Sequence, residues 1–233
     1  MIKAVFFDWF NTLAHFEPPR HQLYRQALLK SGIEISPAEV MRGVLLADQY
    51  FFEENAKSPV EKRSQQEQIE VYLHYPNSIL AEAEVEVSQE LPLQILKTVR
   101  QQFKGGTFAL FDDVLSTLQA LKQQDITLGL ITNLNRDVAS ICRKLGLQPY
   151  LDFVVTPQVA GADKPQPPIF LAALDRAGVD ADQAVHVGDQ YQVDVVGARG
   201  VGITPILIDR YGILPDVSDC RKIHSLTELM QHL

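Results

Sequence analysis

Carboxylates recur in this sequence where apolar runs give way to polar residues. Asp8 directly follows one such run, Asp189 follows another, and Asp194 lies five residues beyond Asp189. At a separation of ~4 Å, two carboxylates repel each other by roughly 4 kcal/mol at an effective dielectric constant of 20. If these three meet, a cation must offset them, and both Lys164 and a hard divalent ion with oxygen ligands are suited to this. Taken singly, each residue has an ordinary interpretation as a turn former, a helix-capping residue or a solvated charge.

The runs before these residues predict the strands of a mostly parallel, doubly wound sheet. They are short, rich in branched and aromatic residues, and separated by helical patterns, which is typical of an α/β fold. The predicted strands are Ile2–Phe7, Ile126–Ile131, Phe153–Thr156, Ala184–Val187 and Ile203–Ile208, with a small edge strand over Lys222–His224. The predicted helices of this part include Arg136–Leu145, Tyr191–Arg199 and Leu226–Leu233. Ligands of such sheets bind beyond the carboxyl ends of the strands, where Asp8, Thr132, Asn133 and Asp189 are expected.

A helical block interrupts this pattern after the first strand. Ser36, Pro37 and Glu39 indicate an N-cap, a first-turn proline and a capping box that open a long helix. Residues 81–102 continue in helical spacing, no strand-length apolar run is evident, and Gly105-Gly106 marks the return to the first pattern. We therefore expect an α/β core domain of residues 1–14 and 106–233, with a helical domain of residues 15–105 inserted in it.

The order of these residues resembles that of the haloacid dehalogenase-like hydrolase superfamily. Asp8 through Thr12, then Thr132, then Lys164-Pro165, then Gly188-Asp189 with Asp194 follow that family's motifs, and the helical block lies where the family inserts a cap. The resemblance implies a hydrolase, with Asp8 as the nucleophile that forms an aspartyl-phosphate. It implies that Thr132 and Lys164 bind the phosphoryl group of a small phosphorylated metabolite, that Asn133 also binds the substrate, and that Lys164 acts in catalysis with Asp8 and neutralises its charge. It also implies Mg²⁺ as cofactor, with Asp8, Asp189, Asp194 and the main-chain carbonyl of Phe10 as ligands.

Phe10 departs from the phosphatase pattern. Phosphatases of the family usually carry a second aspartate there, which protonates the leaving group, a contribution typically of about 10²–10⁴-fold in rate. His15 or Glu17, further along the same loop, could supply the proton instead. An aromatic residue at this position is also found in metal-independent haloacid dehalogenases, for which Arg20 is the candidate halide-binding residue, although an arginine after two prolines is more often a surface residue. A weakly active protein that binds a phosphorylated ligand or a partner is a third alternative.

Composition limits the partners. The chain has 233 residues, of which 46% are hydrophobic, and a formal net charge of −8. This charge argues against a nucleic acid or an anionic membrane as partner. The two cysteines, Cys142 and Cys220, lack metal-site spacing and are compatible with a reducing compartment. The sequence shows no leader peptide and no apolar run near the ~18 residues of a spanning helix, so we expect a cytoplasmic protein. The oligomeric state is left open.

Overall fold

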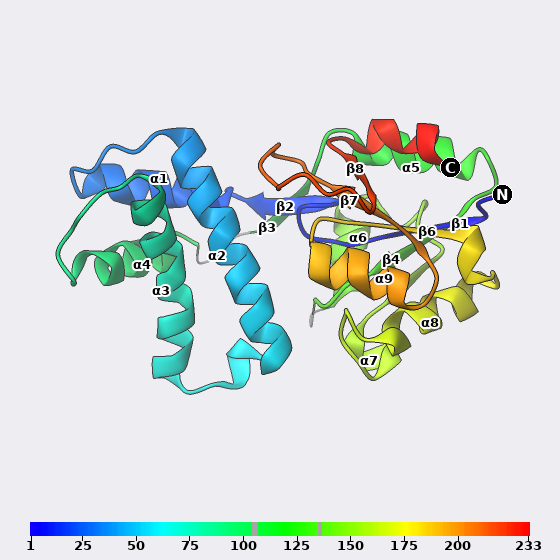
Figure 1. Cartoon of the computed structure of the whole chain (residues 1–233), viewed down its shortest axis with the longest axis horizontal. Helices are drawn as coiled ribbons and strands as arrows, with labels where there is room; N and C mark the ends of the chain where they lie inside the picture. Colours follow the sequence, from blue (N-terminus) through cyan, green and yellow to red (C-terminus); the bar gives the residue numbers. More distant parts are fainter. Residues whose placement is uncertain (104–106, 135–136) are drawn as a thin grey trace. The chain divides into compact units, whose positions relative to one another are not determined.

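The chain divides into two compact units (Figure 1). The structure, a computed structural model, describes residues 1–103, 107–134 and 137–233. Unit 1 consists of Met1–His15 and Phe108–Leu233, and unit 2 of Phe16–Thr107. The predicted boundary at Gly105-Gly106 and the predicted helix start at Arg136 lie outside the described residues. That the two units act as a catalytic core and a cap stays a prediction.

Unit 1 contains a six-stranded sheet. Its strands are β1 (Ala4–Phe7), β4 (Thr127–Ile131), β5 (Phe153–Val155), β6 (Ala184–Gly188), β7 (Thr204–Ile208) and β8 (Arg221–Ile223). They follow the order β5-β4-β1-β6-β7-β8, and neighbouring strands pair in parallel. The predicted doubly wound α/β fold is therefore confirmed. The central strand β1 has its two neighbours in β4 and β6, so the carboxyl ends of these three strands meet at one edge.

Helices cover both faces of this sheet because side chains alternate along each strand. Val5 and Phe7 pack into a core that includes residues of α5, α6 and η4, whereas Ala4 and Phe6 pack with residues of α8 and α9. Figure 1 shows α5 and the C-terminal turns on one side of the sheet and α8 with α9 on the other. The bounds are α5 (Val114–Lys122), α6 (Val138–Lys144), α7 (Pro157–Ala160), α8 (Pro167–Ala177), η2 (Ala181–Gln183), η3 (Tyr191–Val195), α9 (Val196–Gly200) and η4 (Leu226–His232).

Two predicted helices of unit 1 have other geometries. The segment predicted as one helix over Tyr191–Arg199 begins with the π-helical η3 and becomes α-helical only in α9. The predicted terminal helix Leu226–Leu233 is a 3₁₀ helix, η4. Apolar spacing predicts that a segment is helical, but it does not distinguish these close variants.

Unit 2 is largely helical and has its own core. Its helices are α1 (Arg20–Lys30), α2 (Pro37–Lys57), η1 (Val60–Lys62), α3 (Gln65–Glu82) and α4 (Leu91–Gln102). The predicted capping box is confirmed, because the Ser36 side chain accepts from the Glu39 N–H and the Glu39 carboxylate accepts from the Ser36 N–H. The predicted continuous helix over residues 81–102 is wrong. Glu84 has a φ of 52°, in the left-handed region, which ends α3 after Glu82. Within the described residues, no helix is both long and apolar enough to cross a bilayer.

Two short strands depart from the predicted all-helical block. β2 (Ala14–Glu17) and β3 (Thr107–Leu110) form a separate two-stranded sheet. The division between units 1 and 2 falls inside both strands. Neither was predicted, because four residues of mixed burial carry too little periodicity to distinguish a strand from a loop.

Candidate active site

Asp8 begins a tight loop at the carboxyl end of β1. Its N–H continues the pairing of the strand by donating to the Val187 carbonyl at 2.8 Å, and its side chain is only 8% exposed. Asn11 turns the chain with a φ of 55°, a conformation that asparagine tolerates better than most residues. Its amide donates to Asp189 Oδ2 at 3.2 Å. This Asp8 loop (residues 8–13) is thereby connected to the end of β6.

Lys164 lies between two carboxylates. Its ammonium group donates to Asp8 Oδ1 and to Asp194 Oδ1 at 2.7 Å, and its side chain is 2% exposed. Asn133 fixes the main chain at this point: its Nδ2 donates to the Lys164 carbonyl at 3.0 Å, and its Oδ1 accepts from the Lys164 N–H at 2.8 Å. Both amide atoms of Asn133 are therefore bonded to the main chain, which indicates that it positions Lys164; the predicted contact of Asn133 with substrate is untested.

Asp194 is held from three directions. Besides Lys164, His186 Nε2 lies 2.9 Å from its Oδ1, and the Gln190 N–H donates to its Oδ2 at 3.1 Å. A Cβ on Gly188 would lie 2.2 Å from Asp194 Cγ, so only glycine allows this close approach. The spacing of Gly188, Asp189 and Asp194 thus has a steric reason.

The three aspartates predicted to bind metal are brought together. Asp8, Asp189 and Asp194 each offer a carboxylate oxygen within 4.8 Å of the other two. Asp189 Oδ1 is buried without a hydrogen-bond partner among the described residues, although buried polar atoms normally have one. An unpartnered oxygen beside two further carboxylates fits a hard divalent cation such as Mg²⁺. Phe10, the fourth predicted ligand through its carbonyl, lies in the same loop as Asp8 and forms an isolated bridge with Ala14.

The pKa shifts in the cluster indicate that the single positive charge of Lys164 does not compensate all three buried carboxylates. Burial, reinforced by Asp194, raises the pKa of Asp8 to about 6 against the opposing effect of Lys164. Burial, Asp8 and Asp194 together raise the pKa of Asp189 well above its usual value. Burial also acts to raise the pKa of Asp194, but Lys164 and His186 outweigh it and lower that pKa. Lys164 alone therefore does not offset the burial of all three carboxylates, and a further cation would stabilise the ionised forms of Asp8 and Asp189.

Thr132 follows β4 directly and is 3% exposed. Its Oγ1 accepts from the Leu134 N–H at 3.1 Å. A hydroxyl that accepts one hydrogen bond still has its own proton to donate, so Thr132 is suited to bind an anionic oxygen. This role, like the roles of the other predicted site residues, stays a prediction.

His186 is part of the cluster but was given no role from the sequence. It lies inside β6, is 1% exposed, and packs edge-on against the ring of Phe170 at 5.3 Å. Burial lowers its pKa, against the opposing effect of Asp194, so the neutral ring donates Nε2–H to Asp194. The available signal was a histidine within an otherwise apolar strand, two residues before Gly188.

Arg20 lies in unit 2, and its side chain is 22% exposed. It pairs with the buried Asp48 and donates to Tyr75 Oη at 2.9 Å, while Tyr75 donates to Asp48 Oδ1 at 2.5 Å. Arg20 is therefore a partly exposed residue with specific partners, which lie 28 and 55 residues away in sequence and leave no local pattern. Its proposed binding of halide is untested.

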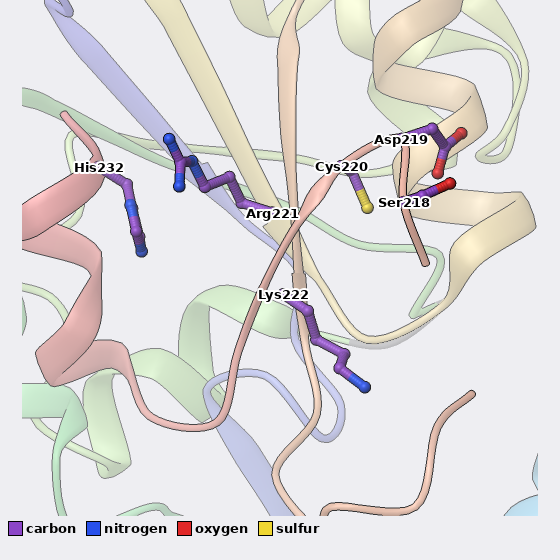
Figure 2. Close-up of a pocket in the computed structure, with 6 residues that line it drawn as sticks. All are labelled: Ser218, Asp219, Cys220, Arg221, Lys222 and His232. Atoms are coloured by element: carbon purple, nitrogen blue, oxygen red, sulfur yellow. The ribbon is translucent and has the colours of Figure 1, made fainter. Parts of the chain in front are cut away.

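A surface depression of about 520 Å³ lies elsewhere in unit 1, at the edge strand β8 (Figure 2). It is lined by Ser218, Asp219, Cys220, Arg221, Lys222 and His232. Several of these groups are bonded to neighbours: Lys222 Nζ to Asp216, and Asp219 to Arg199. None of the lining residues belongs to the carboxylate cluster, and we assign the depression no catalytic role.

Comparisons with known proteins agree with the motif order. The sequence model of a family described as haloacid dehalogenase-like hydrolase matches residues 2–202. "Haloacid dehalogenase-like hydrolase domain-containing protein 3" of Danio rerio is 27% identical over 213 residues, which are 90% of this chain and 86% of that protein. A ribulose-1,5-bisphosphate 5-phosphatase of Halopiger xanaduensis is 34% identical over 102 residues, which are 43% of each chain.

Solved structures of similar proteins cover the whole chain. A HAD phosphatase from Thermococcus onnurineus is 26% identical with a TM-score of 0.58, and the match covers 99% of this chain and 97% of that one. A 2-haloacid dehalogenase from Pseudomonas syringae is 29% identical with a TM-score of 0.57 and the same coverage. Both kinds of relative thus have the fold of this chain at similar levels of identity.

Proposed function

Because the chain belongs to the haloacid dehalogenase-like hydrolases, we propose that it is a Mg²⁺-dependent phosphatase that acts on a small phosphorylated metabolite through Asp8. The observation that carries this proposal is the group of three carboxylates with the unpartnered Asp189 Oδ1. A dehalogenase that displaces halide without a metal has no need for this arrangement. The similarity to named phosphatases supports the same choice.

In the proposed reaction, Asp8 attacks phosphorus and forms an acyl phosphate while the bond to the leaving oxygen breaks. With a pKa of about 6, Asp8 is largely ionised at neutral pH and is nucleophilic there. Lys164, which already touches Asp8, would bind the charged phosphoryl oxygens together with the Thr132 hydroxyl. Water then hydrolyses the acyl phosphate and restores Asp8. Mg²⁺, held by Asp8, Asp189, Asp194 and the Phe10 carbonyl, would neutralise charge and polarise the phosphoryl group.

Magnesium should stabilise the wild type and not the variant Asp189→Asn. An ion that binds only the folded state stabilises it by about 2.7 kcal/mol at a hundredfold excess over Kd, which corresponds to a rise in Tm of about 5–10 °C for a chain of this size. Without Mg²⁺, Asp189→Asn should have a higher Tm than the wild type. The raised pKa of Asp189 means that its ionised form destabilises the fold, and this cost grows as pH rises above the unfolded pKa, so the neutral asparagine should have the higher Tm at pH 7.5.

Thermal melts with and without MgCl₂ check this expectation, with Asp219→Asn as the matched control because that carboxylate is 44% exposed and pairs with Arg199. The control should respond to Mg²⁺ as the wild type does. Equal responses of wild type and Asp189→Asn would place the ion elsewhere. A wild type that does not respond and that releases halide from 2-haloacids would favour the dehalogenase, the alternative that Phe10 and the similarity to a 2-haloacid dehalogenase support.

Replacing Phe10 by aspartate should raise the turnover of alkyl phosphates by about one to two powers of ten. The wild type lacks the usual proton donor at this position, so its rates should depend steeply on the acidity of the leaving group. Steady-state kcat values for p-nitrophenyl phosphate and a sugar phosphate in both proteins check this. Phe10→Leu is the control, since it removes the ring without adding a carboxylate and should bring no gain. A flat leaving-group dependence in the wild type would instead point to His15 or Glu17 as the acid.

A further inference from the structure

A residue that follows β7 also contacts the Asp8 loop. Arg210 donates from Nη2 to the Thr12 carbonyl at 2.6 Å and from Nε to the same oxygen at 3.2 Å. Its side chain is 5% exposed. Thr12 lies in the same short loop as Asp8, so the guanidinium binds the main chain that carries the proposed nucleophile.

The third guanidinium nitrogen of Arg210 is bound by Asp113, just before α5. Arg210 Nη1 donates to Asp113 Oδ2 at 2.5 Å. The same oxygen accepts from Ser225 Oγ at 2.6 Å and from the Leu226 N–H at 2.8 Å. The guanidinium carbon also lies 4.3 Å from the centre of the Phe111 ring. The arginine is therefore oriented by a carboxylate that is itself held by two donors from η4 and the residue before it.

This geometry restricts the loop more than a single hydrogen bond would. A planar guanidinium with two N–H groups on one oxygen and a third on a carboxylate fixes both direction and distance. The neighbouring residue of the same loop, Asn11, binds Asp189 through its side-chain amide. The Asp8 loop is thus bound from β6 through Asn11 and from β7 through Thr12. Asp113 and Arg210 are 97 residues apart in sequence.

We propose that Arg210 is a positioning residue for the hydrolase: by binding the Thr12 carbonyl it holds the Asp8 loop in its reactive geometry, and Asp113 orients it. It is not a catalytic residue, because the contacts that define its role are to the main chain and to Asp113. Small displacements of a reacting group can lower rates by as much as about 10²-fold. Loss of Arg210 should therefore lower kcat by about 10–100-fold and leave KM within about threefold.

The single tryptophan of the chain provides a local test. Trp9 lies in the Asp8 loop, next to Asp8, and is 1% exposed. Arg210→Met should roughly double the acrylamide quenching of Trp9 fluorescence, because a loosened loop opens to solvent more often. Arg199→Met is the matched control: Arg199 is 41% exposed, pairs with Asp219 and should leave both quenching and kcat unchanged. Far-UV circular dichroism establishes that each variant is folded.

Arg210→Lys is the second variant and decides the matter if Arg210→Met does not fold. Lysine keeps the charge but lacks the fork, so its quenching and its kcat should fall between those of wild type and Arg210→Met. Wild-type quenching and kcat in a folded Arg210 variant would overturn the proposal, as would a change in KM alone. The expected loss of kcat rests on the proposed function, whereas the quenching does not. If the wild type releases no phosphate, the proposed phosphatase function is contradicted. The positioning role of Arg210 is then tested by the quenching of Trp9 fluorescence alone.

Discussion

Asp8→Asn should fold as the wild type does and lose at least about 10⁴-fold in the rate of phosphate release, because a carboxamide cannot replace the attacking carboxylate. Its fold should be retained because Asn Oδ1 can still accept from Lys164, which now donates to the Asp8 carboxylate. The Tm without Mg²⁺ should not fall, since burial already raises the pKa of Asp8 to about 6 and its charge is not stabilising there.

Phosphate release from p-nitrophenyl phosphate and acetyl phosphate with excess MgCl₂ measures the effect. Acid-quenched wild type should carry a phosphoryl group on the peptide that contains Asp8, and the variant should carry none. Asp216→Asn is the control, because its carboxylate is 99% exposed and pairs with Lys222 rather than with a residue of the cluster. An Asp8→Asn protein that turns over at the wild-type rate would exclude Asp8 as the nucleophile.

Lys164→Met should lower both activity and stability. Removing one partner of a buried ion pair commonly costs about 3–5 kcal/mol, here a fall in Tm of about 10 °C, because Asp8 and Asp194 lose their shared cation. Losing a donor to the phosphoryl group should lower kcat by about 10³-fold. Lys122→Met is the control: its pair with Asp152 is 34% and 39% exposed, and such pairs contribute at most about 1 kcal/mol.

The loss of stability in Lys164→Met should depend on pH in a defined direction. In the wild type Lys164 lowers the pKa of Asp194, so that pair stabilises the fold above the unfolded pKa of the aspartate and is lost only under acidic conditions. Without Lys164, the pKa of Asp8 should rise further, and the variant should gain stability as pH falls and its carboxylates are protonated. The difference in Tm between wild type and Lys164→Met should therefore narrow from pH 7.5 to pH 5. A difference that widens over this range would show that the stability loss has another cause.

The sequence predicts the parallel sheet because its central strands, β1, β4 and β6, are buried on both faces. Short, continuously apolar runs such as Ala184–Val187 predict an α/β fold with parallel strands from the sequence alone. The convergence of Asp8, Asp189 and Asp194 follows from the topology, since parallel strands end at one edge. The capping box at Ser36 depends only on residues three apart in the chain, so the sequence predicts it as well.

What the sequence does not predict are contacts between residues that are distant in the chain. The Asp113 carboxylate, just before α5, binds Arg210, which lies 97 residues away in the chain. Asn133, whose predicted contact with substrate is untested, has an amide that binds the main chain of Lys164, 31 residues away. Arg20 and Asp48 are a third case. In each, the residue type indicates that a partner is needed and the fold decides which one.

The two-stranded sheet of β2 and β3 has a consequence for how such proteins diversify. The chain leaves unit 1 through β2 and returns through β3, and these strands are paired neighbours. An insertion whose entry and exit adjoin can be lengthened, shortened or exchanged between genes without changing the order of the six strands or the register of β1 against β4 and β6. Mutation can thus explore new sequences in unit 2, while the residues around Asp8 stay under separate constraint.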